Sequence, residues 1–342
     1  MAEVAKHNVV RDAAPAPAAF LAADVGGTHA RVGLVSGDGR GPVTVRAYQR
    51  YACAQWPSLT AILRDFVATL GASVRVRACA VASAGYVLGD AIVNDNLPWP
   101  VSIRDIREGL GIERLAVVND FEAVAYAAQF LADADTVPVI ENTLPRGEGP
   151  VLVMGPGTGL GSAVLLPGQP HATVLPTEAG QIALAPGDER ETEILRLFAR
   201  ERAHVPYEHA LSGPGLVNLY RALATLRGAP AAVDEPAEVT RRALERSDAL
   251  AVETLDVFCG LLGGFVGDLA MLYGARGGVF LAGGILPQIR DLLPGSRFAE
   301  RFHNKGVMRA FLQQVPVRLM EHGQLGVIGA AGMFLDGRAR DG

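Results

Sequence analysis

The stretch that decides the fold is AFLAADVGGTHARVGLV, residues 19–35. An apolar run, the pair Gly26 and Gly27, and a second apolar run together predict a β-hairpin with a tight turn. Glycine lets the backbone approach a bulky anion, and the N–H groups of such a turn, with the Thr28 hydroxyl, bind phosphate oxygens. Asp24 ends the first run and is placed to hold Mg²⁺, directly or through water. The alternative is a plain hairpin with glycine at positive φ.

The same pattern recurs at residues 151–166, where Gly157, Thr158 and Gly159 form the turn. This repeat predicts two related domains, each with a phosphate-binding hairpin. The second turn precedes a strand rather than a helix and lacks the Gly-Lys-Ser/Thr ending of a P-loop, which excludes both common nucleotide fingerprints. A third glycine site, Gly283–Gly284, follows an apolar strand and would let an adenine ring lie against the backbone. A simple turn that starts a helix is the alternative there.

Between these turns, strand and helix patterns alternate along the chain. Apolar residues at helical spacing predict helices that begin after Ser58 and at Ser102, and apolar runs predict buried strands at 74–83, 115–118 and 277–281. Further helices are expected at 121–131, 191–202, 215–226, 236–245, 248–273 and 325–335. Alternation of this kind is typical of an α/β fold with largely buried sheets.

The composition favours a cytoplasmic protein that binds small molecules. The formal charge is −5, so the chain has no general electrostatic attraction for nucleic acid or an acidic membrane. Three widely spaced cysteines argue against a disulfide framework, and neither cysteine nor histidine spacing indicates zinc. Glu3 and the lack of an apolar segment after it argue against a signal peptide. The apolar stretch 249–275 contains acidic residues and is expected to be a buried helix rather than a membrane span.

Five motifs carry a family resemblance. They occur in the order DVGGT (24–28), NDF (119–121), GTGLG (157–161), LSGPGL (211–216) and GVFLAGG (278–284). Together they resemble the bacterial glucokinase family of the actin-like/hexokinase superfamily, over about residues 18–335. The resemblance implies an α/β, two-lobed actin-like ATPase (ribonuclease H-like) fold with a cleft between a small and a large domain.

The expected domain limits follow from this resemblance and from the composition. Residues 1–17 end in AAPAP and are expected to form a flexible N-terminal tail. Residues 18–131 would form the small domain, completed by the C-terminal helix 324–337. Residues 132–323 would form the large domain.

The resemblance also implies roles for individual residues. Asp120 would be the catalytic base that accepts the proton of a sugar hydroxyl during attack on the γ-phosphate, and Asn119 would hydrogen-bond the sugar. Glu178 and Glu208 match the family's sugar-binding glutamates, whereas Gln181 stands where the family has a histidine. From the residues alone, Asn-Asp is a helix N-cap, and both roles are compatible.

Other candidates lie around these positions. The segment after strand 74–83 contributes to the sugar pocket in this family, which makes Asn94, Asn96 and Trp99 candidates, although Trp99 also suits core packing. Gly213 opens the Ser-Gly-Pro-Gly helix start, whose N–H groups would touch the nucleotide. With Asp24 and the glycine turns, it completes the predicted nucleotide site.

The resemblance therefore implies a glucokinase of carbohydrate metabolism and glycolysis that uses ATP and Mg²⁺ to convert glucose to glucose 6-phosphate. Relatives are commonly homodimers, so a homodimer is expected. Gln181 leaves open a kinase for N-acetylglucosamine or another hexose. Two alternatives come from other classes of protein. The first is a non-catalytic sugar-sensing regulator, which Asp24 and Asp120 argue against. The second is an actin-like filament protein or chaperone ATPase, which would not need Glu178 and Glu208.

Overall fold

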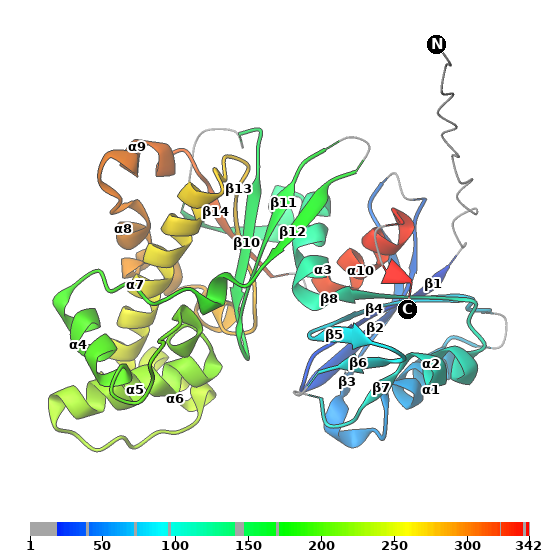
Figure 1. The fold of residues 1–342 in the computed structure, drawn as a ribbon, viewed down its shortest axis with the longest axis horizontal. Coiled ribbons are helices and arrows are strands. Elements are labelled where there is room, and N and C mark those ends of the chain that lie inside the picture. The colour runs from blue at the N-terminus through cyan, green and yellow to red at the C-terminus, as the bar shows by residue number, and fades with distance from the viewer. Residues whose placement is uncertain are drawn as a thin grey trace, which may run out of the picture. The chain divides into compact units, whose positions relative to one another are not determined.

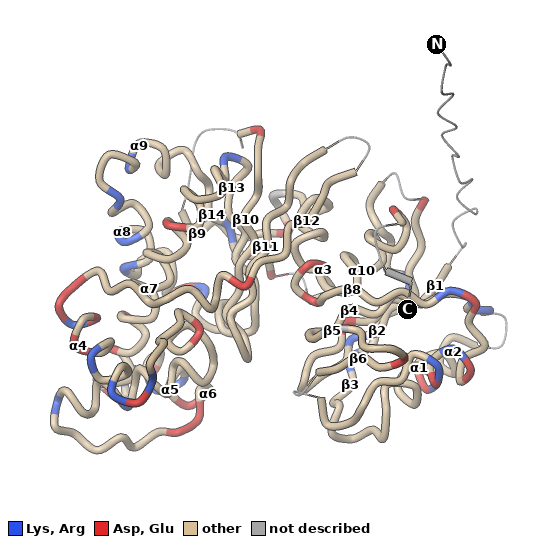
Figure 2. Tube along the Cα trace, viewed as in Figure 1, with Lys and Arg blue, Asp and Glu red and all other residues tan. Residues whose placement is uncertain are grey.

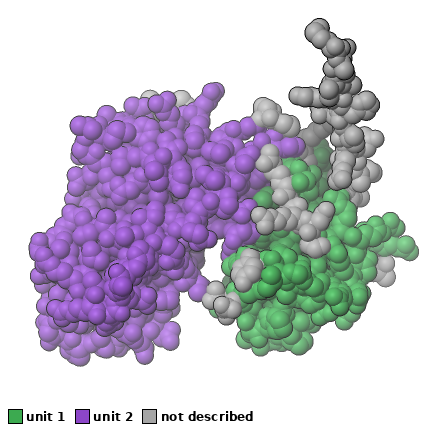
Figure 3. Space-filling view, viewed as in Figure 1, with its two compact units in different colours: residues 1–118, 330–342 green, residues 119–329 purple. Residues whose placement is uncertain are grey.

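The computed structural model describes residues 19–38, 41–71, 74–94, 97–140, 147–168, 171–321, 323–337 and 340–341. The chain forms two compact units (Figure 3). Unit 1 extends to Val118 and resumes at Ala330, and unit 2 comprises Asn119–Gly329. The predicted tail at 1–17 lies outside the described residues.

Unit 1 is built on a six-stranded sheet with the order β15-β8-β4-β1-β2-β3 (Figure 1). The strands are β1 Phe20–Val25, β2 His29–Ser36, β3 Thr44–Ala52, β4 Ala78–Ser83, β8 Arg114–Asn119 and β15 Arg340–Asp341. The predicted hairpin is confirmed, because β1 pairs antiparallel with β2. On its other side β1 pairs parallel with β4, so these two strands end at the same edge of the sheet.

Both faces of this sheet are covered, which explains the continuous apolar run of β1. Leu21 and Val25 belong to a buried cluster with side chains of α1 (Leu59–Thr69) and α2 (Ile103–Leu110). On the opposite face the ring of Phe20 lies 4.9 Å from that of Phe334. A strand buried on both faces reads as unbroken apolar sequence rather than as alternation.

The helices of unit 1 begin where the sequence predicted. The Ser58 hydroxyl accepts a hydrogen bond from the Ala61 N–H, and the Ser102 hydroxyl accepts one from the Asp105 N–H, both at 3.1 Å. Such side-chain caps satisfy N–H groups that the first helical turn leaves without partners. The strand predicted at 74–83 is shorter than expected, because pairing begins only at Ala78.

A small three-stranded sheet follows β4 and was not predicted from the sequence. It consists of β5 Tyr86–Leu88, β6 Ala91–Val93 and β7 Val101–Ser102. Strands this short give too few residues for an alternating pattern to be recognised.

Unit 2 repeats the plan of unit 1 in a second six-stranded sheet, with the order β12-β11-β10-β13-β14-β9. The strands are β9 Thr136–Ile140, β10 Val151–Pro156, β11 Leu160–Leu166, β12 Thr173–Thr177, β13 Gly278–Leu281 and β14 Val317–Met320. Here too a central strand pairs antiparallel with its hairpin partner and parallel with a later strand, as β10 does with β11 and β13. The internal repeat read from the two glycine turns is therefore also a repeat of topology.

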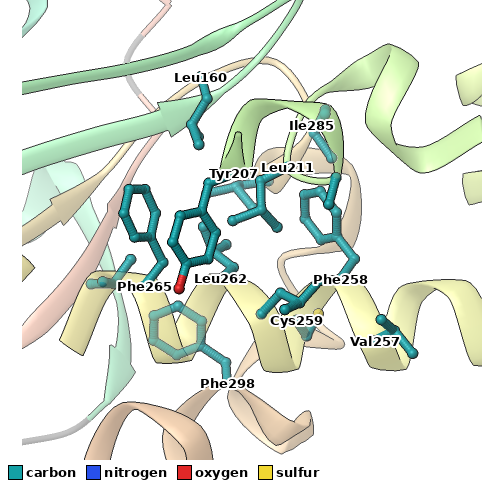
Figure 4. Close-up of a cluster of buried hydrophobic side chains, with 14 of the residues drawn as sticks. Leu160, Tyr207, Leu211, Val257, Phe258, Cys259, Leu262, Phe265, Ile285 and Phe298 are labelled. Atoms are coloured by element: carbon teal, nitrogen blue, oxygen red, sulfur yellow. The ribbon is translucent and has the colours of Figure 1, made fainter. Parts of the chain in front are cut away.

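Helix α7 forms the centre of the unit 2 core. The helices of this unit are α3 Asp120–Ala127, α4 Glu189–Phe198, α5 Gly213–Arg227, α6 Pro236–Leu244, α7 Ala249–Leu272, α8 Arg297–His303 and α9 Arg309–Leu312. Figure 4 shows Phe258, Leu262 and Phe265 of α7 directed at Tyr207 and Leu211. Of the described helices, α7 alone is long and apolar enough to cross a membrane, but 72% of its apolar 18-residue stretch is buried inside the protein. The prediction of a buried helix is confirmed.

Charged residues cluster on the helices of unit 2, and one pair is buried. Figure 2 shows acidic and basic residues together on α4 and basic residues on α8. Glu191 of α4 is only 1% exposed and pairs with Arg301 of α8. The Glu191 carboxylate also accepts the Gly187 N–H at 2.7 Å. A buried charge must be paired and hydrogen-bonded, and this one is.

Helix α10 (Leu325–Leu335) begins in unit 2 and ends in unit 1. Gly329 lies so close to α3 that a Cβ there would come within 1.7 Å of the Ala123 carbonyl oxygen. The boundary between the two compact units lies at Val118/Asn119, whereas the expected domain boundary lay at 131/132. The difference arises because α3 packs against β11 and β12 of unit 2.

Candidate active site

The first glycine turn lies at the end of β1, in unit 1. It is closed by the Gly26 N–H, which donates to the His29 carbonyl at 3.0 Å. Asp24 precedes the turn and is 17% exposed at its side chain, and Arg31 donates to its carboxylate at 3.1 Å. Burial raises the pKa of Asp24, and Arg31 opposes part of this shift. The predicted nucleotide residues of unit 1 therefore form one continuous turn with a charged pair beside it.

Cys53 supports this turn from within the core, a role that the sequence did not reveal. Its backbone N–H donates to the Thr28 carbonyl at 2.9 Å, and its thiol donates to the Gly26 carbonyl at 3.4 Å. The Trp99 indole N–H in turn donates to the Cys53 carbonyl at 3.2 Å. Trp99 is 9% exposed and packs in the buried cluster of unit 1, which fits the packing role also considered for it.

Basic side chains lie beside the turn on β2 and β3. The imidazole of His29 is 3.1 Å from the Thr28 hydroxyl, and Arg50 lies 3.0 Å from the His29 Nε2. Burial and the nearby arginines Arg50 and Arg31 lower the pKa of His29. Positive charge on these two strands would suit a turn that binds phosphate.

Asn94 lies at the same sheet edge as the turn. Its amide donates to the Ser83 hydroxyl at 3.4 Å. Ser83 ends β4 and is the register partner of Val25 at the end of β1. The structure thus brings Asn94 to the strand ends that carry the turn, while Asn96 lies outside the described residues.

Asn119 and Asp120 mark the passage from β8 into α3. Asn119 is the N-cap, since its side-chain oxygen accepts from the N–H groups of Phe121 and Glu122 at 2.9 and 3.1 Å. Asp120 is the first residue of the helix, is partly buried and accepts the Phe121 N–H at 2.8 Å. The cap reading of this dipeptide is therefore confirmed, with Asn119 as the principal cap.

Phe121 fixes α3 on the second hairpin. A Cβ on Gly161 would come within 2.2 Å of the Phe121 ring, so the ring packs against the bare backbone of β11. Only glycine leaves that space. The position of Asp120 relative to β11 consequently depends on Phe121 and Gly161.

The second glycine turn, in unit 2, gathers the remaining predicted nucleotide residues. The Gly157 N–H donates to the Gly159 carbonyl, and the Gly213 N–H at the start of α5 donates to the Gly157 carbonyl, both at 2.8 Å. Thr158 is exposed at the tip of the turn. Because β10 and β13 are parallel neighbours, the turn after β10 and the glycines after β13 lie at one edge of the sheet.

Gly283 and Gly284 complete this edge and differ in what they tolerate. Gly283 has φ +90°, and a Cβ there would approach the Pro156 carbonyl oxygen to 2.3 Å. Gly284 is exposed, and a Cβ on it would meet open space. The close approach of β10 and β13 at this point therefore requires glycine at 283 but not at 284.

Two of the predicted sugar residues, Gln181 and Glu208, contact each other. The Gln181 amide donates to Glu208 Oε1 at 3.0 Å, and the Leu160 N–H donates to Glu208 Oε2 at 2.8 Å. Leu160 was not singled out from the sequence, because a backbone donor leaves no residue-type signal. Glu178 is exposed just before the short helix Ala179–Gln181.

Among the described residues, no group of three or more His, Cys, Asp or Glu side chains is arranged to hold a metal ion. All three cysteines are free and buried. Cys79 and Cys259 are fully buried core residues, as their apolar surroundings predicted. Of the predicted site residues, Asp24 is the carboxylate that could hold a cation, directly or through water.

Strand–glycine turn–strand repeats in two related units, with an acidic residue at each of two strand ends, define an actin-like ATPase fold of the sugar-kinase class. The chain matches the glucokinase family over residues 21–336. It belongs to the glucokinase family and is a sugar kinase that transfers phosphate from ATP.

Individual relatives agree over nearly the whole chain. A glucokinase-like protein of Xylella fastidiosa strain 9a5c is 48% identical over 97% of this chain and 99% of its own length. The crystal structure of a glucokinase from an Antarctic psychrotroph superposes with a TM-score of 0.80 at 34% identity, covering 92% of this chain and 98% of its own. A ROK family glucokinase from Streptomyces griseus, in complex with glucose and AMPPNP, shares the fold with a TM-score of 0.62 at 20% identity, covering 92% and 98%.

Proposed function

We propose that the protein phosphorylates glucose with ATP to give glucose 6-phosphate, and that Asp120 is the general base. The observation that carries this proposal is the position of Asp120 at the first residue of α3, directly after β8. Asn119 supplies the helix cap there, so the helix start does not depend on the Asp120 carboxylate alone. A carboxylate at a strand end can accept the proton of an attacking hydroxyl.

The glycine turns would bind the nucleotide. In unit 1 the Gly26–Thr28 turn, with Arg31 and Arg50 on the adjoining strands, offers backbone donors and positive charge for phosphate oxygens. In unit 2 the Gly157–Gly159 turn and the start of α5 at Gly213 offer further N–H groups. Gly283 and Gly284 provide bare backbone against which a flat base can lie. Phosphoryl transfer depends mainly on such positioning and charge stabilisation.

Mg²⁺ would be held near Asp24. One carboxylate oxygen already accepts from Arg31 at 3.1 Å, so we propose that the ion binds through water and the nucleotide phosphates. When bound, Mg²⁺ supplies positive charge that offsets the charge on the phosphates.

The sugar would be held by Asn94, Asn119, Glu178, Gln181 and Glu208, with Asp120 at the reacting hydroxyl. Carboxylates and amides are suited to the paired donors and acceptors of sugar hydroxyls. In the solved structure of the Streptomyces griseus relative, glucose and AMPPNP are bound to a protein of this fold, which supports sugar and nucleotide as substrates here.

A kinase for N-acetylglucosamine or another hexose is the second candidate. It is favoured by Gln181, whose amide is already bonded to Glu208 and whose shape differs from the histidine of the family pattern. A changed side chain at a sugar-contacting position alters which substituent the site tolerates.

A coupled ADP-release assay with MgATP separates these candidates. The panel is glucose, N-acetylglucosamine, mannose, fructose and a control without sugar. Turnover with glucose well above the others supports glucokinase. Turnover mainly with another sugar favours the second candidate, and hexose binding without turnover would show that the proposal is wrong and indicate a regulator.

We further propose that the enzyme is a cytoplasmic homodimer, as the family resemblance implies. Light scattering on the purified protein, with and without glucose, measures its mass. A monomer at micromolar concentration would contradict the dimer.

A further inference from the structure

Backbone pairing in unit 2 brings Gln181 beside Glu208. Ala183 forms an antiparallel bridge with Pro206. On either side of it, the Leu184 N–H donates to the Val205 carbonyl and the Tyr207 N–H donates to the Ile182 carbonyl, both at 2.9 Å. Beside the bridge the chain forms the short 3-10 helices Ala179–Gln181 and Tyr207–His209, which contact each other and bring Gln181 beside Glu208. Their contact therefore follows from the fold of the two segments rather than from side-chain reach alone.

The backbone of Glu208 is anchored to the core on both sides. Tyr207 is 3% exposed and stacks on Phe265 of α7, with ring centroids 3.8 Å apart (Figure 4). The Ser212 hydroxyl donates to the Glu208 carbonyl at 2.8 Å. The backbone of Glu208 is consequently fixed, and the direction of its carboxylate is set by the hydrogen bonds that the carboxylate accepts.

Those partners connect the sugar residue to the nucleotide turn. Gln181 donates to one carboxylate oxygen at 3.0 Å, and the Leu160 N–H, next to Gly159, donates to the other at 2.8 Å. A Cβ on Gly159 would come within 2.7 Å of Glu208 Oε2. His204 holds the other side of Gln181, because its ring donates to the Gln181 carbonyl at 2.8 Å.

We propose that Gln181 is a positioning residue for Glu208, and that the Glu208 carboxylate links the sugar-binding segment to the glycine turn Gly157–Gly161. This inference rests on the proposed function, in which Glu208 contacts the sugar. In addition to its own contact with the sugar, Gln181 then affects sugar affinity through Glu208, because its amide donates a hydrogen bond there. A change in the glycine turn that displaces Glu208 weakens sugar binding even when no nucleotide is present.

The first test is calorimetric titration of the full-length protein with glucose in the absence of nucleotide. Gly159→Ala is expected to raise the dissociation constant about tenfold, the effect of losing one hydrogen bond to a charged group. Gly295→Ala is the control in the same unit, since a Cβ there meets open space and the residue lies outside the proposed site, and glucose affinity should stay within about twofold. Equal effects of the two variants would overturn the proposal.

The second test uses Gln181→Glu and Gln181→Met, whose side chains have similar length but disturb Glu208 to different degrees. A carboxylate at 181 repels Glu208, whereas the thioether only removes the hydrogen bond. We expect the KM for sugar to be about tenfold higher with Glu than with Met, and kcat to change much less. Because Gln181 is exposed, neither change should disturb folding.

Repeating this pair in a Glu208→Gln background completes a double-mutant cycle. The difference between Glu and Met at 181 should then disappear, because the repelling charge is gone. A difference that persists there, or that is absent in the wild-type background, would overturn the proposal. A wild-type protein that phosphorylates none of the sugars would instead contradict the proposed function itself. Failure of the proposed function is therefore observed in the wild-type protein, and failure of this inference is observed in the variants.

Discussion

Arg31 and Asp24 are direct register partners in the β1–β2 hairpin, and the guanidinium donates to the carboxylate at 3.1 Å. The pair flanks the glycine turn of unit 1, with Asp24 on β1 and Arg31 on β2. Burial raises the pKa of Asp24 despite Arg31, so holding this carboxylate ionised opposes folding at neutral pH. The site thus keeps a charge that the fold alone does not favour, which is typical of a functional position.

Asp24→Asn is expected to raise the melting temperature and to weaken MgATP binding. The amide oxygen can still accept from Arg31 but carries no desolvated charge. A carboxyl whose folded pKa is raised stabilises the fold only at low pH and loses that contribution as the pH rises. The gain from Asn should therefore be present at pH 7 and should vanish near pH 4. Melting curves at both pH values, with nucleotide titrations, measure this; a variant less stable at pH 7 would contradict it.

Asp120→Asn should lower kcat about 10²–10⁴-fold while leaving sugar affinity nearly unchanged. Asn keeps the size and one acceptor for the Phe121 N–H, so α3 should remain intact. Glu122→Gln, in the same helical turn, is the matched control for loss of a carboxylate near the helix start. Single-turnover kinetics and glucose titrations check both variants. Full activity of Asp120→Asn would exclude it as the base.

Gly283→Ala and Gly284→Ala should differ sharply although they are neighbours. Gly283 has φ +90° and lies against the Pro156 carbonyl, so alanine there should lower the free energy of unfolding by at least about 1–2 kcal/mol. A Cβ at Gly284 meets open space. Urea unfolding and nucleotide titration compare the two. Equal stability of both variants would show that β10 and β13 are not in this close contact.

In the His209→Gln variant, stability should fall less steeply than in the wild type as the pH is lowered into the mildly acidic range. Burial, and then the nearby Arg202, lower the pKa of His209, with Glu201 opposing them. Its ring nitrogen lies 3.2 Å from the Asn218 amide, and its ring packs edge-on against Phe198. A histidine with a depressed folded pKa contributes stability that is present above pH ~6.5 and is lost as the pH falls below it.

Melting temperatures of wild type and His209→Gln from pH 7.5 to 5 measure this effect. The variant should be less stable at pH 7.5 because it loses ring packing, yet its curve should fall less steeply. His29 and His303 also have lowered pKa values, so a residual slope is expected. An unchanged slope would mean that His209 does not titrate in this range.

Local signals in the sequence were sufficient for the elements that carry the site. Both glycine hairpins, the caps at Ser58 and Ser102 and the buried α7 were predicted, because turns, caps and apolar periodicity depend on near neighbours in the chain. The edge strands β9 and β12 and the sheet β5–β7 were missed. Short strands acquire their identity from the strands beside them, and that information is not local.

The sequence by itself determined the family and the α/β class, and it predicted the residues that carry the chemistry, from Asp24 to Gly284. Only the tertiary structure decided how those residues are held. Cys53 beneath the first turn, the Leu160 N–H on Glu208 and the bond from Gln181 to Glu208 join residues 27–48 positions apart in the chain. Hydrogen bonds of that kind form only when distant segments are brought together by sheet pairing and core packing, so no local pattern records them.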